Sequence, residues 1–403
     1  MKRKAIRRIL TLASIALLFA PILLPGPRGP HWSIDLVSYG FHLREETDGR
    51  HYMSSSKVAA SENVVALVMN NLAPGSQIGP PGREYAKTRW NYALLLFDAN
   101  NGKLLARGGP WTADLEFDLF ASSKGNFILD LHNYQGPGEK NGETLLLFSP
   151  EGKQLNELDL PPELTNSQGH VWTALISPAR NTVLVSLSDG DMTRYKVLDA
   201  NTLEERFEGT QRRSDPAIVA ISDEQMLGAM PSAKPSSLPV TNQEHEFYIR
   251  TFQGTWRHLM DSATDFVFLS DHLMAGLEAL DDAKGFIFTV STTDGTRIMS
   301  YSFQKHDIAI SGGGPLVQSS DGARVGCIFV LDPQAWLWRQ LDMGPETSEI
   351  YIWAPPNPTP IFNLKVKSQF ENFSFSPGGS WLAVADQRYL RAVPLPKSSD
   401  PKI

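Results

Sequence analysis

Short apolar runs alternate with polar turns along most of the chain, and the clearest case is Asn372 to Asp386 (N-F-S-F-S-P-G-G-S-W-L-A-V-A-D). The turn in this segment is Ser376-Pro377-Gly378-Gly379-Ser380. Proline fixes φ, glycine tolerates positive φ, and both interrupt a strand ladder. Two apolar runs of strand length on either side of such a turn predict a β-hairpin.

Degenerate copies of this hairpin recur along the chain. The first apolar residue after each turn is Val64, Phe127, Val183, Met226, Leu273, Val325 or Trp381. Successive anchors are separated by between 43 residues (Val183 to Met226) and 63 residues (Val64 to Phe127). In most copies a second hairpin follows, with turns such as Asp98 to Gly102. Each copy is therefore predicted to be a four-stranded antiparallel meander, close to the roughly 40 to 50 residues of a propeller blade.

These units resemble the repeats of seven-bladed β-propellers of the WD-repeat, YVTN and quinoprotein-like group, from about His31 to Pro396. Phe375 to Gly379 resembles the S-P-D-G turn of those repeats, with Gly378 where Asp is usual. Leu95 to Lys103 resembles the YVTN and quinoprotein strand-turn-strand, although Ala106 stands where the quinoprotein repeat has its docking Trp. The resemblance implies an all-β, seven-bladed propeller. It does not imply a function, because propellers host unrelated activities.

The two ends of the repeat region complement each other. The last unit has only three predicted strands, at about Phe373 to Phe375, Trp381 to Val384 and Tyr389 to Val393. The strand-like segment near Trp32 precedes the first complete unit. We therefore expect Ile34 to Phe41 to pair as the outermost strand of the last blade, since an open array would leave exposed edges.

The N-terminal segment predicts export. Its five cations are followed by the 16-residue apolar run Ile9 to Leu24, and residues 25–30 form a Pro/Gly linker. The run is shorter than the roughly 20 residues that span a bilayer, which favours a signal peptide. No A-x-A-like site precedes the linker, so an uncleaved anchor stays open as the alternative. We expect residues 31–398 to form the propeller, periplasmic or extracellular, and residues 399–403 a polar tail.

Composition and charge restrict the partners. Hydrophobic residues make up 41% and charged residues 20%, as in ordinary globular proteins. The formal net charge is −7, and five cations lie in the leader, so the rest of the chain is more acidic still. Nucleic acid is excluded as a partner, because binding it needs a basic surface. Membrane contact is expected only through the N-terminal segment, and the single cysteine, Cys327, is expected to be a small buried residue.

No catalytic motif is present. The nine histidines include no i, i+4 or H-x-H pair of the kind that binds zinc or copper. There is no G-x-S-x-G nucleophile elbow, and Gly312-Gly313-Gly314-Pro315 lacks the P-loop lysine. We therefore expect no metal and no cofactor, and the sequence names no catalytic residue.

The long insertions all occupy connections that are predicted to lie on the same face of the meanders. In a meander with strands a to d, the a-b and c-d turns share one face, and the b-c and d-a connections share the other. The long segments occupy b-c positions (Asn71 to Arg89, Asn133 to Gly142, Pro231 to Glu244, Asp332 to Glu349) and d-a positions (Gly108 to Leu115, Pro161 to Gly169). One face is therefore predicted to be elaborated, and loops on a rigid scaffold commonly carry function.

Aromatic residues on this face are the candidate binding residues: Tyr85, Trp90, Trp111, Tyr134, His170, Trp172, Trp336 and Trp338. Tryptophan also packs between propeller blades, and that alternative stays open for each. The sequence favours a non-catalytic binding or scaffold module for a protein or small-molecule ligand. The alternative is a lactonase-like enzyme at the mouth of the central channel, which a convergent cluster of ionisable side chains there would favour. The oligomeric state is not predictable.

Overall fold

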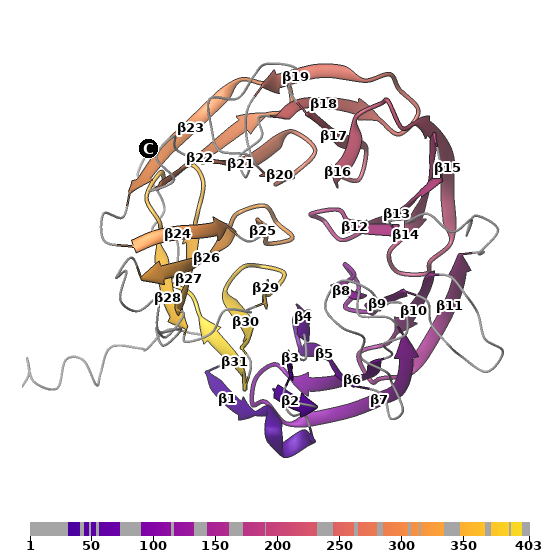
Figure 1. The fold of residues 1–403 in the computed structure, drawn as a ribbon, viewed down its shortest axis with the longest axis vertical. Coiled ribbons are helices and arrows are strands. Elements are labelled where there is room, and N and C mark those ends of the chain that lie inside the picture. Colours follow the sequence, from indigo (N-terminus) through magenta and orange to yellow (C-terminus); the bar gives the residue numbers. More distant parts are fainter. Residues whose placement is uncertain are drawn as a thin grey trace, which may run out of the picture.

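The computed structural model of the 403-residue chain is a ring of seven β-sheets, the blades of a propeller (Figure 1). The structure describes residues 31–40, 44–47, 50–53, 56–72, 90–113, 117–132, 143–160, 172–189, 191–231, 245–261, 265–279, 285–304, 308–313, 316–333, 347–366, 372–386 and 388–396. The predicted leader and linker (residues 1–30) and the polar tail (399–403) lie outside these residues. Within the described ranges, no helix is both long and apolar enough to cross a membrane.

The first four blades are four-stranded meanders. Blade 1 contains β4 (Ser56–Ala60), β5 (Val64–Leu72), β6 (Trp90–Asp98) and β7 (Leu104–Ala113). Blade 2 contains β8 (Phe117–Ala121), β9 (Phe127–His132), β10 (Glu143–Phe148) and β11 (Gln154–Leu160). Blade 3 contains β12 (Trp172–Ile176), β13 (Thr182–Asp189), β14 (Met192–Asp199) and β15 (Glu205–Arg212). Blade 4 contains β16 (Ala217–Ile221), β17 (Gln225–Pro231), β18 (His245–Thr251) and β19 (Arg257–Asp261).

The remaining blades follow the same plan with two variations. Blade 5 contains β20 (Asp265–Phe268), β21 (Leu273–Ala279), β22 (Gly285–Thr292) and β23 (Arg297–Gln304). In blade 6, both β24 (Ile308–Gly313) and β25 (Val317–Gln318) pair with β26 (Val325–Pro333), which continues to β27 (Thr347–Trp353) and β28 (Phe362–Val366). Blade 7 contains β29 (Asn372–Phe375), β30 (Trp381–Ala385) and β31 (Tyr389–Pro394), joined by β1 (Trp32–Asp35).

The predicted anchors agree with these strands. Val64, Phe127, Leu273, Val325 and Trp381 each begin the second strand of their blade, and Val183 and Met226 are the second residues of theirs. The all-β, seven-bladed prediction is therefore confirmed. Cys327 is fully buried in the apolar core formed by blades 5 and 6, as the sequence predicted.

Ring closure is confirmed, but the predicted bounds of the closing strand were wrong. β1 pairs antiparallel with β31, with Trp32 opposite Ala392 and Asp35 opposite Tyr389. After Asp35 the chain turns into the short 3₁₀ helix η1 (Leu36–Tyr39) instead of continuing as a strand to Phe41. The Asp35 carboxylate accepts from the Val37 N–H and caps this helix, and Gly40, at φ 84°, ends it.

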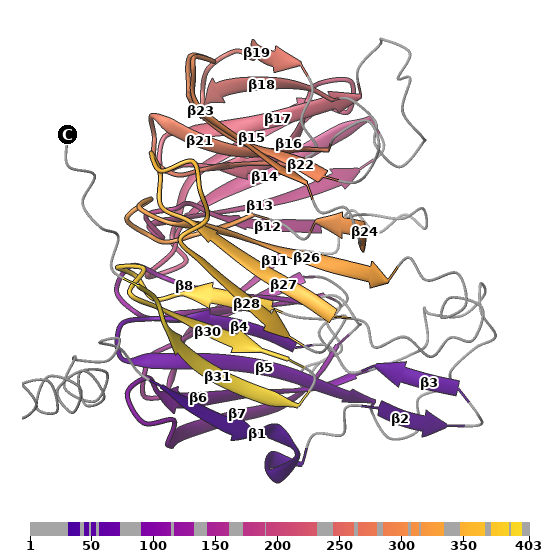
Figure 2. The same cartoon turned by 90° about the vertical axis from the view of Figure 1, so that its left-hand side faces the viewer.

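The connection from η1 to blade 1 carries a small hairpin. Its strands are β2 (Arg44–Thr47) and β3 (Arg50–Met53), which pair only with each other among the described strands. Figure 2 shows this hairpin at the face where β5 ends. That is the face of the b-c and d-a connections, because β1 is the outer strand of blade 7 and β4 is the inner strand of blade 1.

The turns after the inner strands share one local design. In six blades, the side-chain oxygen of a serine at the end of the inner strand accepts an N–H from the start of the next strand. The serines are Ser61, Ser122, Ser177, Ser222, Ser319 and Ser376. Several of these turns reach positive φ at the fourth position, where Gly125, Gly322 and Gly379 have φ values of 82°, 67° and 60°. Serine satisfies the turn and glycine tolerates its left-handed residue, so the polar residues of the repeat fix tight turns on this face.

Candidate functional site

The inner strands run in the same direction from blade to blade. Each begins at the b-c and d-a face and ends at the a-b and c-d face, because the serine turn always follows the inner strand. Residues near the start of an inner strand and residues just after its end therefore lie at opposite ends of the ring axis. A buried ionisable side chain lies at each end, Arg180 at one and Asp130 at the other.

Arg180 links three blades at the end on the a-b face. It lies in the serine turn of blade 3, where its φ is 61°. Its guanidinium donates to the Ala60 carbonyl of blade 1 (2.6 Å) and to the Phe375 carbonyl of blade 7 (2.9 Å). Blade 3 thus reaches across the ring to the seam between the first and last blades, and Arg180 is buried. Burial lowers its pKa to about 10, while the charge of Asp321 opposes that shift, so the guanidinium stays cationic at neutral pH.

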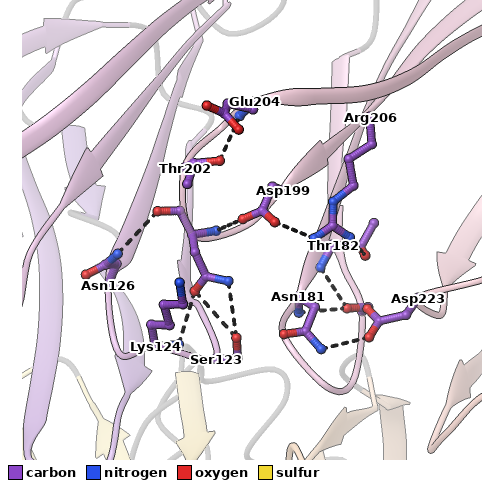
Figure 3. A network of polar contacts seen from close by, with 12 residues as sticks. Ser123, Lys124, Asn126, Asn181, Thr182, Asp199, Thr202, Glu204, Arg206 and Asp223 are labelled. Atoms are coloured by element: carbon purple, nitrogen blue, oxygen red, sulfur yellow. Dashed lines mark hydrogen bonds and ion pairs between the residues drawn. The ribbon is translucent and has the colours of Figure 1, made fainter.

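Polar bonds join neighbouring turns on the same face (Figure 3). The side-chain oxygen of Asn201, in the outer turn of blade 3, accepts from the Lys124 N–H of blade 2 at 3.1 Å. The Asn126 amide donates to the Asn201 carbonyl at 3.3 Å. On the other side of blade 3, the Asn181 amide donates to the Asp223 carboxylate of blade 4 at 2.9 Å. The a-b face of these blades is therefore tied together turn to turn.

A second polar group lies near the start of the inner strands of blades 1 and 2. Lys57, the second residue of β4, places its Nζ 2.8 Å from Oδ1 of Asp118, the second residue of β8. Asp118 lies directly opposite Asp130 in the pairing of β8 with β9. His132, two residues further along β9, has its Nε2 3.7 Å from the Asp130 Oδ2. One lysine, two carboxylates and one imidazole therefore gather in what we call the inner polar cluster.

The inner polar cluster has a solvent-facing side and a buried side. The side chains of Lys57 and Asp118 are 37% and 38% exposed, whereas that of Asp130 is fully buried. Neither Asp130 carboxylate oxygen has a hydrogen-bond partner within the described part of the chain. The 3.7 Å separation from His132 is too long for a hydrogen bond. Buried acceptors without donors are rare and costly, and at Asp130 both carboxylate oxygens are in that situation.

The pKa of the partly exposed carboxyl group, that of Asp118, is shifted by its surroundings. Desolvation raises the pKa of Asp118 above its usual range, Lys57 opposes that shift, and the neighbouring Asp130 adds to it. A carboxyl group in such surroundings holds a proton more readily than a free aspartate does. Within the described ranges, no three His, Cys, Asp or Glu side chains are arranged to hold a metal ion. The cluster can therefore accept hydrogen bonds from a bound group and can exchange a proton through Asp118.

The candidate binding residues predicted from the sequence are not members of the inner polar cluster. Trp90 is 5% exposed, in the apolar core between blades 1 and 2. Trp111 packs against the same core, with its ring centroid 5.4 Å from that of Phe148. Both therefore take the interblade packing role that the sequence left open. Trp172 begins β12. Tyr85, Tyr134, His170, Trp336 and Trp338 lie outside the described residues.

The sequence carried signals for the residues that were missed. Asp130 interrupts the otherwise apolar run Phe127 to Leu131, and Asp118 interrupts Phe117 to Ala121. A charged residue inside an inner or second strand is a signal, but only the strand register shows that the two face each other. Arg180 occupies the fourth turn position, which is glycine in three other blades. A long side chain where the repeat has glycine, at a left-handed position, is the sequence signal for a special role of Arg180.

No family model and no curated protein match the chain, but several solved structures have a similar fold. Among solved structures, the β-propeller domain of the Trilobed protease from Pyrococcus furiosus is similar, with 13% identity, 86% of this chain and 99% of that chain covered, and a TM-score of 0.49. The WD40 domain of Toxoplasma gondii coronin matches with 9% identity over 92% and 88% of the chains, at a TM-score of 0.45. TolB from Acinetobacter baumannii matches with 13% identity over 81% and 80%, at 0.37. These similarities carry no argument about activity, ligand or partner.

Proposed function

We propose that the chain is an exported, non-catalytic binding propeller that takes a protein or small-molecule ligand on its b-c and d-a face. The observation that supports this is the difference between the two faces. On the a-b face, Arg180 bonds across the ring to blades 1 and 7, and further hydrogen bonds join neighbouring turns. A surface whose polar groups already bond one another offers few of them to a partner.

On the opposite face, the b-c and d-a face, long connections join consecutive strands. β5 ends at Leu72 and β6 begins at Trp90, β17 ends at Pro231 and β18 begins at His245, and β26 ends at Pro333 and β27 begins at Thr347. Because these strands are antiparallel, all three connections leave and return on the same side. Function concentrates in such connections when a rigid scaffold holds their ends.

Export is part of the proposal and rests on the basic, apolar leader in residues 1–24. Fractionation of cells expressing the full chain, with protease added to intact cells and to cells with a permeabilised envelope, tests it. We expect the protease to cut the propeller once it can enter the space outside the cytoplasmic membrane, while that membrane is still intact. Protection of the chain in intact spheroplasts would contradict export.

The binding face is tested by matched variants of the full chain. In one, residues 76–86 and 234–242 are replaced by Gly-Ser segments of equal length. In the other, Lys124 and Asn201 on the a-b and c-d face are replaced by alanine. Cross-linking in the native envelope should capture the same species with the parent and the a-b face variant, and lose it with the loop variant. Equal capture by the loop variant would overturn the assignment of the face.

One observation favours the second candidate, a small-molecule enzyme at the channel mouth. The raised pKa of Asp118, beside Asp130 and His132, is the kind of setting in which a carboxyl group acts as a general acid or base. A panel of lactones should then be opened by the parent and by Glu157→Gln, an exposed change on the same blade, but not by Asp118→Asn. Failure of the parent to open any lactone would remove this candidate.

A further inference from the structure

The inner polar cluster contains more acceptor capacity than its own donors use. Asp118 and Asp130 face each other across adjacent strands, and Lys57 bonds to Asp118 at 2.8 Å. Asp130 has no donor within the described part of the chain and is fully buried. A buried carboxylate oxygen without a donor loses its hydration without replacement, so a group that supplies donors is stabilised on arrival.

We propose that Lys57, Asp118, Asp130 and His132 form a binding site for a small organic cation that carries a primary ammonium group. Asp130 has no exposed surface, so the ammonium group would enter beside the partly exposed Lys57 and Asp118 and displace the side chains that cover Asp130 before donating to its two oxygens. It offers three donors and no acceptor, which complements a carboxylate that has acceptors and no donor. The bond formed is charge-assisted, the stronger class of hydrogen bond.

The charges of the cluster select a cation. Two carboxylates face one lysine, and the lysine is already bonded to one of them. An anionic ligand would meet Asp118 and Asp130 together, in a setting where desolvation is strong enough to raise the pKa of Asp118. A neutral polyol could donate to Asp130 but would leave its charge uncompensated. The cation is therefore the occupant that the cluster favours.

His132 does not replace this ligand. Its Nε2 is 3.7 Å from Asp130 Oδ2, so the imidazole lies beside the carboxylate without bonding it directly. Within the strand, the side chains of residues 130 and 132 point to the same side of β9, so His132 borders the position that the ammonium group would take. It would therefore contact the carbon atoms next to the bound nitrogen.

This site is separate from the partner surface proposed above. It is built from β4, β8 and β9 and requires none of the long connections. A loop replacement that abolishes partner capture should leave ammonium binding intact, and a change at Asp130 should leave partner capture intact. The two proposals therefore fail independently.

The test uses the full chain and four probes: ethylamine, ethanolamine and 1,4-diaminobutane, with 1,2-propanediol as the neutral comparison. Calorimetric titration of the parent should show binding of at least one amine and none of the diol. In Asp130→Asn the amine should bind at least about tenfold more weakly, since a charge-assisted bond is lost. The control Glu157→Gln removes one exposed carboxylate from β11 and should bind as the parent does. Absence of amine binding to the parent, equal binding by Asp130→Asn, or equal binding of the diol would each overturn the proposal.

A second variant predicts a change of the opposite sign. Lys57→Gln removes the cation that competes for the carboxylates, and it lies on the partly exposed side, where a substitution is tolerated. It should bind the same amine several-fold more tightly than the parent. Weaker binding would contradict the assignment of an ammonium site even if Asp130→Asn failed to fold.

Discussion

The two ends of the inner strands hold buried ionisable groups in opposite situations. At the a-b end, the Arg180 guanidinium donates to two carbonyl oxygens at the closing seam of the ring. At the other end, the Asp130 carboxylate is fully buried and accepts no hydrogen bond from the described residues. A buried charge with hydrogen-bond partners holds structure together, whereas one without hydrogen-bond donors marks a position that a further donor group would stabilise.

The closing seam explains why the partnered charge lies where it does. The seam between blades 7 and 1 is the only one formed by the two ends of the repeat region, and β1 closes it from the outside through β31. Arg180 spans the same seam from the inside, and the Ala60 N–H donates to the Ser374 hydroxyl across it at 3.1 Å. Mutations can separate the outer contribution of β1 from the inner contribution of Arg180.

The largest expected effect is the loss of β1. Deletion of residues 31–35 removes the ladder with β31, the packing of Trp32 and Ile34 on the core shared by blades 1 and 7, and the bond from Trp32 to the Ala99 carbonyl. We expect the free energy of unfolding, measured by urea denaturation, to fall by about 5 kcal/mol. Deletion of residues 399–403 is the control and should cost nothing measurable. An unchanged denaturation midpoint in the first variant would mean that Arg180 alone suffices to close the ring.

The next effect concerns Arg180 itself. Arg180→Met keeps the apolar stem and leaves the Ala60 and Phe375 carbonyls without their donors. Buried acceptors left unpaired should lower the free energy of unfolding by about 3 kcal/mol. Arg206→Met is the matched control, because Arg206 is 44% exposed and pairs with Asp199 at the surface. That change should cost less than about 1 kcal/mol, and equal losses in the two variants would refute the special role of Arg180.

The smallest effect is a pH dependence of the outer closure. Asp35 pairs with Arg388 across β1 and the start of β31, and this hydrogen bond holds the pKa of Asp35 below its usual value. A lowered folded-state pKa contributes stability that is present above the ordinary pKa of 3.8 and is lost as pH falls through the folded value. Thermal unfolding of the parent should therefore show a slight extra loss between pH 4 and pH 3, roughly the range in which such a group titrates. Asp35→Asn should lack it, and an identical pH profile in both proteins would contradict the assignment.

The fold was accessible from sequence because its signals are local. Apolar runs recur in each blade, serine turns in six blades and glycines at left-handed positions in several, so Val64, Phe127 and Trp381 could be placed at strand starts. The end of β1 was misplaced because the apolar run continues past Asp35, and only the capping bond of Asp35 and the position of Gly40 turn the chain away. A hydrophobic run alone does not show where a ladder ends.

The inner polar cluster was not accessible in the same way. Lys57, Asp118 and Asp130 come from three strands of two blades, and only their register and the arrangement of the blades bring them together. The aromatic candidates illustrate the converse difficulty. A tryptophan such as Trp90 at the end of a long connection has the same pattern whether it binds a ligand or fills the space between blades, and here it fills that space.

The most direct test of the contrast between the two ends is the effect of Asp130→Asn on the free energy of unfolding, measured by urea denaturation without ligand. This change keeps the shape of the side chain and removes the charge. If Asp130 does not stabilise the fold, the variant should be within about 1 kcal/mol of the parent or more stable, in contrast to Arg180→Met. A loss of about 2 kcal/mol or more would show that Asp130, like Arg180, is a partnered structural charge, and would contradict the account.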